Sequence, residues 1–254
     1  MCTDPRPASS ANPCTHSGLR AELLDRRFSS GYERKLGRTA SAPWDVPQRL
    51  LGTVAWGPGQ LGRVNGSLSQ MARFIHLNGP PGIGKSTVAS AFADRHPGVL
   101  NLDVDRVTAL VGGYQDRFLE SFAAGVLLAT AMARAHLASG HDVILPQMMT
   151  NVNAEEMAVF ESSAAAAKAE YCQILLIANV ESAVDRCMER AKAGDPRQDA
   201  VSKVIADNGG PDFVRKLHAQ VTEFSAWRQP YAVIDCELLT VEQTCRAVEA
   251  ALAP

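Results

Sequence analysis

A glycine-rich run, G-P-P-G-I-G-K-S-T, occupies residues 79–87 and has the residue types that bind a nucleoside triphosphate. It matches the pattern G-x-x-x-x-G-K-[ST] in full, between an apolar segment and an amphipathic one. Glycines let the backbone turn its N–H groups inward around an anion, and the following helix N-terminus adds partial positive charge. The predicted phosphate-binding residues are Gly79, Pro80, Pro81, Gly82, Ile83, Gly84, Lys85, Ser86 and Thr87.

Three polar side chains at the end of this run have distinct expected roles. Lys85 is expected to bridge the β- and γ-phosphates and to act in catalysis, and the Ser86 hydroxyl to bind Mg²⁺. Thr87 is expected to contact the α-phosphate. A chance glycine-rich turn is the structural alternative, and the complete pattern in a strand–loop–helix setting argues against it.

Two carboxylates, Asp103 and Asp105, follow the second predicted strand. The carboxyl ends of strands in a doubly wound sheet line the ligand crevice, so both should lie beside the phosphate loop. Placed two apart on an extended segment, they should point the same way. One of them could then hold the water shell of Mg²⁺, and the other could accept the proton of an attacking hydroxyl. The alternative is that they cap the next helix.

A polar segment over residues 191–199, broken by glycine and proline, is typical of the mobile lid of small kinases. Arginines there can neutralise charge on a transferring phosphoryl group. Arg190 and Arg197 are the predicted catalytic arginines, whereas Arg186 lies one turn earlier. The alternative is a solvated, charged helix end. Tyr114 and Arg117 lie in a further polar loop, and the pattern leaves open whether they contact substrate.

The third predicted strand is followed by Pro146 and Gln147, where many P-loop proteins have an aspartate. A neutral Gln147 cannot supply charge to a metal, which argues against a vigorous ATPase motor. No N-K-x-D motif for reading guanine is present either. These features favour phosphoryl transfer, while a nucleotide kinase and a nucleotide-dependent regulatory ATPase remain the alternatives.

Strands alternate with helices from residue 71 onward, which predicts a parallel sheet covered on both faces. The predicted strands are residues 73–78, 99–102, 142–145, 172–178 and 232–236, and the predicted helices are residues 85–95, 118–139, 154–169, 182–192, 211–227 and 240–251.

The phosphate loop followed by Asp103 and Asp105 resembles the small P-loop kinases of metabolites and antibiotics, such as shikimate kinase, gluconate kinase and chloramphenicol phosphotransferase. The resemblance runs from residue 71 to about residue 235. It implies a P-loop NTPase fold, a three-layer α/β/α domain with a five-stranded parallel sheet ordered 2-3-1-4-5. It further implies ATP as phosphate donor, Asp105 on the substrate hydroxyl and Asp103 assisting Mg²⁺.

Residues 1–70 are rich in proline and glycine and have little periodicity, which predicts a loosely ordered extension. Met71 stands directly before the first strand, so this extension is either part of the protein or lies upstream of its true start. Residues 71–254 are predicted to form the kinase-like domain.

Net charge, apolar runs and cysteine content bear on the partners and the location of the protein. The net charge of −2 gives no basic footprint for nucleic acid, and no apolar run is expected to span a membrane. Six scattered cysteines without a C-x-x-C pair predict reduced thiols in a cytoplasmic protein. The expected partner is a small molecule with a hydroxyl group, and the oligomeric state is left open.

Overall fold

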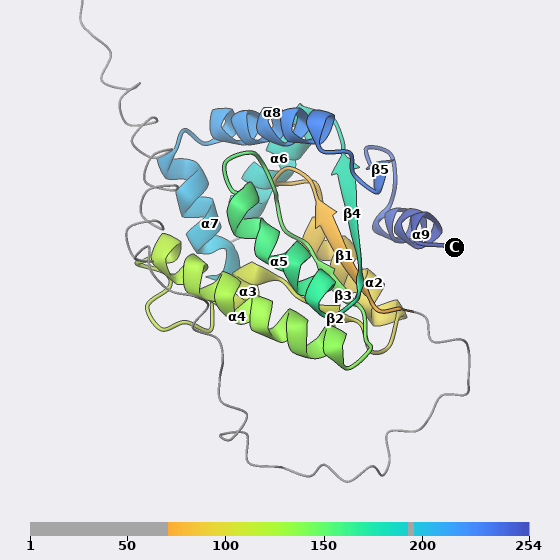
Figure 1. Ribbon diagram of the computed structural model, residues 1–254. Coiled ribbons are helices and arrows are strands. Elements are labelled where there is room, and N and C mark those ends of the chain that lie inside the picture. The colour runs from red at the N-terminus through yellow and green to blue at the C-terminus, as the bar shows by residue number, and fades with distance from the viewer. Residues whose placement is uncertain (1–70, 193–195, 254) are drawn as a thin grey trace, which may run out of the picture. The chain divides into compact units, whose positions relative to one another are not determined.

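The computed structural model describes residues 71–192 and 196–253, which form an α/β domain (Figure 1). The predicted boundary at residue 71 stays a prediction, because residues 1–70 lie outside the described part. The strands are β1 (Arg73–Asn78), β2 (Leu100–Asn101), β3 (Val143–Leu145), β4 (Glu170–Ile177) and β5 (Ala232–Asp235). The helices are α2 (Lys85–Arg95), α3 (Val104–Thr108), α4 (Phe118–Ala138), α5 (Ala154–Ala166), α6 (Val180–Lys192), α7 (Pro196–Asp207), α8 (Pro211–Trp227) and α9 (Val241–Ala251).

The five strands form one parallel sheet in the order β2-β3-β1-β4-β5, which confirms the predicted order. Strand β1 lies at its centre, where Ile75 pairs with Ile144 of β3 and Cys172 of β4. Because all five strands are parallel, their carboxyl ends lie on one edge of the sheet. That edge carries the phosphate loop and the end of β2.

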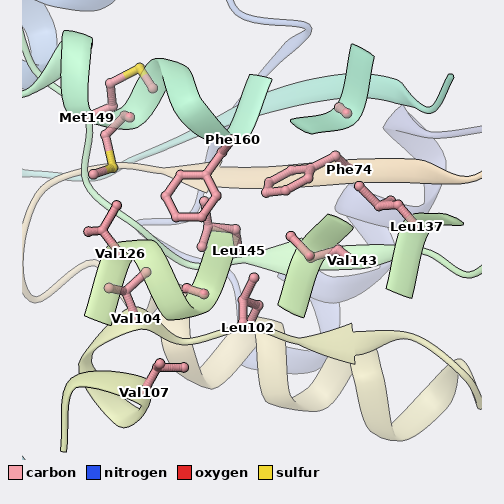
Figure 2. Packing of buried hydrophobic residues seen from close by; sticks show 14 of the residues in the cluster. Phe74, Leu102, Val104, Val107, Val126, Leu137, Val143, Leu145, Met149 and Phe160 are labelled. Carbon is pink, nitrogen blue, oxygen red and sulfur yellow. The ribbon is translucent and has the colours of Figure 1, made fainter. Parts of the chain in front are cut away.

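Two apolar layers cover the sheet, because alternate side chains of each strand face opposite sides. Phe74 faces α3, α4 and α5, where its ring lies 5.8 Å from that of Phe160 (Figure 2). Ile75 and Leu77 face the layer made by α2 and α9. A smaller cluster joins α6, α7 and α8. The observed architecture is therefore the predicted three-layer α/β/α arrangement.

Two helices differ from the sequence-based expectation. Asp105 was expected on an extended segment, but it lies in the first turn of α3, which Asp103 caps. The expected lid over residues 191–199 contains the start of α7, which begins at Pro196, a residue suited to the first helical position. Helix α3 has only five residues, and α7 begins within a polar segment that contains Gly194 and Pro196, so local pattern alone did not separate them from loops.

Helix α4 is long and apolar. By length and composition only, its segment Glu120–Ala138 could cross a membrane, and the expectation of no membrane partner stays a prediction. In the domain it packs against α3 and α5, and 33% of its apolar window is buried. The core helices of soluble proteins meet the same criterion, so this finding alone assigns no membrane role.

The contact between α3 and α4 depends on a glycine. A Cβ atom at Gly125 of α4 would lie 2.1 Å from Thr108 Oγ1 and 3.1 Å from Thr108 Cα. Thr108 is fully buried, and its hydroxyl donates to the carbonyl of Val104 at 2.8 Å. It therefore has little freedom to move, and Gly125 sets how closely α4 approaches the helix that carries Asp105.

Gly125→Ala is expected to lower the free energy of unfolding by about 1–3 kcal/mol, because the added methyl overpacks the contact. Denaturant unfolding followed by circular dichroism measures this change. Gly112→Ala is the control, since a Cβ there meets no atom within 4 Å. Equal stabilities of the two variants would contradict a tight α3–α4 contact.

Candidate active site

The phosphate loop between β1 and α2 is wedged against the neighbouring strand and helix. A Cβ at Gly79 would lie 2.7 Å from the carbonyl oxygen of Leu176 in β4, and one at Gly82 would lie 2.1 Å from that of Ala183 in α6. Both glycines also have positive φ, 151° and 78°. The motif glycines are therefore required by packing against β4 and α6 as well as by the turn itself.

The N-terminus of α2 opens onto this loop. Its N-cap, Gly84, has a left-handed backbone with φ of 97°, and no side chain caps the helix. The first turn has no acidic residue, while Ser86 and Thr87 are exposed there. The free N–H groups and the positive end of the helix dipole therefore suit an anion such as phosphate.

Lys85 lies folded back over the loop. Its Nζ donates to the carbonyl oxygens of Gly79 and Pro80, each at 2.8 Å. Burial lowers the pKa of Lys85 to about 8, and the charge of Arg190 acts in the same direction while that of Asp105 opposes it. A phosphate group would offer this ammonium a stronger partner than two neutral carbonyls.

The charges of Asp103 and Asp105 both act on Lys85 and raise its pKa. Asp103 caps α3, its Oδ1 accepting the N–H of Asp105 at 3.0 Å. Burial, reinforced by the charge of Asp103, raises the pKa of Asp105 to about 6, whereas Lys85 opposes this shift. Capping and a functional role were posed as alternatives. The structure shows the cap, and it also brings both carboxylates close to Lys85.

The arginines predicted for the lid have different surroundings. Arg190 is exposed, and its charge acts on Lys85 and on the buried Cys187. Arg186 instead acts on Glu237, whose pKa is lowered first by the Ser182 hydroxyl. The backbone of Arg197 lies in the first turn of α7, and its side chain falls outside the described part of the structure.

Sequence reading missed Asn78, the last residue of β1. Its Oδ1 accepts the N–H groups of Gly79 and Met149 at 2.8 Å each, and its Nδ2 donates to the Met149 carbonyl at 3.2 Å. The side chain is almost fully buried. Asn78 therefore joins the first residue of the phosphate loop to the segment after β3. An asparagine directly before the motif was the available signal, but its partner lies 71 residues away.

His76 holds the same segment at a second point. Its Nε2 lies 2.7 Å from the Gln147 carbonyl oxygen, which can only accept, so this nitrogen carries the proton. Its Nδ1 then accepts the Tyr171 hydroxyl at 2.6 Å. Burial lowers the pKa of His76 to about 4, so the ring is neutral near pH 7. Together His76 and Asn78 determine where Gln147 lies relative to the phosphate loop.

The oxygens at this edge suit a magnesium ion. Mg²⁺ prefers hard oxygen ligands, keeps several waters, and is held by one or two carboxylates together with substrate phosphates. The exposed Ser86 hydroxyl and the Asp103 carboxylate are such ligands. In the described residues no cluster of three or more His, Cys, Asp or Glu side chains forms a metal cage. Two oxygen ligands beside the phosphate loop fit the usual pattern of Mg²⁺ held together with substrate phosphates.

The sheet order, the loop and its flanking elements define the chain as a P-loop NTPase in fold. A family profile described as an AAA domain matches residues 74–208, which include the loop, both aspartates and Arg190. The chain belongs to this family. No curated protein matches the sequence.

Several solved structures align with most of this chain. A proposed kinase from Chloroflexus aurantiacus is 18% identical, with a TM-score of 0.51 over 72% of this chain and 100% of its own. Mycobacterium tuberculosis APS kinase, solved with AMPPNP and APS, is 17% identical, with a TM-score of 0.47 over 72% and 98%. A gluconokinase from Sinorhizobium meliloti is 16% identical, with a TM-score of 0.45 over 72% and 93%. The family and the first structure confirm, at the level of the fold, the resemblance to small P-loop kinases.

The two roles considered for Asp103 can be separated by substitution. Asparagine caps a helix about as well as aspartate, so Asp103→Asn is expected to keep stability within about 0.5 kcal/mol while more Mg²⁺ is needed for nucleotide binding. Asp103→Ala should in addition lose about 1 kcal/mol of stability. Denaturant unfolding and calorimetric titration at several Mg²⁺ concentrations measure both effects. An unchanged Mg²⁺ dependence in Asp103→Asn would leave Asp103 as a cap only.

Proposed function

We propose that this protein transfers the γ-phosphate of ATP to a hydroxyl group of a small molecule. The observation that supports this best is the gathering of four charged side chains at the phosphate loop: Lys85, Asp103, Asp105 and Arg190. Phosphoryl transfer requires positive charge for the phosphates, an oxygen ligand for the metal and a group that orients the nucleophile. These four residues offer each of them.

The residues of this chain would act by position and charge. The loop and the α2 N-terminus hold the β- and γ-phosphates, and Lys85 leaves its loop carbonyls to bind them. Ser86 and Asp103 would hold Mg²⁺, which would neutralise phosphate charge. Asp105 accepts the proton of the acceptor hydroxyl as its oxygen bonds to the γ-phosphorus, the bond from the γ-phosphorus to the β-phosphate oxygen breaks, and ADP leaves. Arg190 offsets charge on the moving phosphoryl group.

Asp105 is suited to this role by its ionisation. A pKa of about 6 leaves most molecules ionised at pH 7, yet makes the carboxylate a stronger base than an ordinary aspartate. Its position in the first turn of α3 also helps, because the cap at Asp103 and the buried contact with α4 hold that helix. The carboxylate is thus held by elements that do not themselves bind phosphate.

The acceptor is best sought by direct screening. The purified full chain is incubated with ATP, Mg²⁺ and panels of hydroxylated metabolites and antibiotics, and products are identified by the mass added by a phosphoryl group. A nucleoside monophosphate as preferred acceptor would indicate a nucleotide kinase instead. Hydrolysis of ATP that no acceptor stimulates would favour a regulatory ATPase, although a neutral Gln147 follows β3.

Two substitutions distinguish binding from transfer. Lys85→Ala is expected to abolish triphosphate binding, measured by calorimetry. Asp105→Asn should bind ATP nearly normally but lose roughly 10²-fold or more in transfer rate. Its backbone N–H still donates to Asp103, so α3 keeps its cap. Asp94→Asn on the exposed side of α2 is the control and should resemble the native protein. Transfer by Asp105→Asn within about threefold of the native rate would exclude the base role.

The pH dependence of kcat/KM should follow from the ionisation of Asp105 and Lys85. Proton acceptance needs ionised Asp105, so kcat/KM should rise as pH increases through about 6. Phosphate binding needs charged Lys85, so kcat/KM should fall as pH rises through about 8. A bell-shaped profile is therefore expected. Asp105→Asn should remove its acidic limb, and an acidic limb that persists in that variant would assign it to another group.

A further inference from the structure

The outer face of α4, on the side away from the sheet, is apolar and exposed. Leu127, Leu128 and Met132 are 51%, 48% and 41% exposed. Ala131 and Ala135 lie exposed between and beside them. Among the described residues α4 packs chiefly on α3, α5 and β3, all on its inner side (Figure 1). A helix normally turns polar residues outward, so this face has the composition of a contact surface.

The spacing on this face is that of a helix-packing stripe. Positions 120, 124, 127, 131, 134 and 138 recur every three or four residues, and they are Glu-Ala-Leu-Ala-Arg-Ala. Such spacing places all six on one side of an α-helix. The small alanines on either side of Leu127 allow another helix to approach closely. The stripe therefore suits a partner that is itself a helix.

The charged residues of the stripe indicate which partner helix would fit it. Glu120 and Arg134 are the two charged residues of the stripe, and each lies seven residues from Leu127. If a second α4 packs antiparallel with Leu127 on the two-fold axis, Glu120 of each copy lies opposite Arg134 of the other. A parallel pair would place like charges together. We propose that α4 is a self-association surface, through which two copies of this protein form an antiparallel, two-fold symmetric dimer.

The size of this surface sets the expected strength. The helix has 21 residues, about 31 Å at 1.5 Å per residue, and the stripe occupies most of it. A single helix pair is at the small end of specific interfaces, which are weak and reversible. The dimer should therefore dissociate on dilution through the micromolar range. Within the domain, Arg134 Nε donates to Ser163 Oγ of α5 at 3.1 Å, and Glu120 Oε2 lies 4.0 Å from Arg117 Nη1, so the dimer contact has to compete with both interactions.

Sedimentation velocity of the full chain at micromolar concentrations tests the dimer. Leu127→Glu places two carboxylates against each other on the axis and should weaken association by about a hundredfold or more. Leu238→Glu is the matched control: Leu238 is 92% exposed but lies in the β5–α9 connection, on the opposite side of the sheet. Only the first variant should become monomeric. A native monomer at all concentrations, or equal dimerisation of both variants, would overturn the proposal.

Charge exchange tests the orientation without touching the apolar centre. Glu120→Arg should weaken the dimer by about tenfold, because arginine then faces Arg134 of the other copy twice. The double variant Glu120→Arg, Arg134→Glu should restore it to within about threefold. No restoration by the double variant, with both proteins folded by circular dichroism, would exclude the antiparallel register.

The native protein and Leu127→Glu also test whether the outer face of α4 binds a lipid surface instead of a second copy. Phosphatidylcholine–phosphatidylglycerol vesicles are sedimented with the native chain and with Leu127→Glu. Vesicle binding lost in that variant, with a native protein that stays monomeric in solution, would overturn the dimer.

Discussion

The phosphate loop lies so close to β4 and α6 that two of its positions have no room for a side chain. Gly79 contacts the Leu176 carbonyl and Gly82 the Ala183 carbonyl, both at distances that a Cβ would violate. The same two glycines, together with Gly84, have the positive φ angles of the turn. This contact fixes the start of α6 relative to the loop. Arg190, further along α6, is thereby brought within electrostatic reach of Lys85.

The central strand holds the other side of the site. Asn78 and His76 face the α4–α5 side of the sheet and bind the segment after β3 at the Met149 backbone and the Gln147 carbonyl. Both are buried and fully engaged, so moving that segment would leave polar groups unpaired. The phosphate loop is therefore joined to the segment after β3 by hydrogen bonds and to the start of α6 by close packing.

The charged groups at this edge oppose one another in a partly buried setting. Burial lowers the pKa of Lys85, with Arg190 acting in the same direction, and burial raises the pKa of Asp105, with Asp103 acting in the same direction. The charges of Lys85 and Asp105 each partly oppose the shift of the other. The two pKa values consequently approach neutrality from opposite sides, which is the arrangement expected where one group must stay charged and another must accept a proton. The outer face of α4 is separate from this chemistry but is joined to it through the α3–α4 contact at Gly125.

From local pattern, the sequence by itself determined the phosphate loop and most element positions, whereas the strand order was implied by the family resemblance. These follow from residue types at fixed short spacing and from strongly apolar strands such as β4. Only the tertiary structure decided that Asp105 lies on a helix, that α7 follows α6, and that Asn78 and His76 hold the segment after β3. Those features depend on a five-residue helix, on a helix that begins within a polar segment, and on partners about 70 residues apart, which local spacing cannot reveal. The exposed apolar stripe of α4 depends on both sequence and tertiary structure. The sequence contains its spacing, and packing in the domain determines which face of the helix stays exposed.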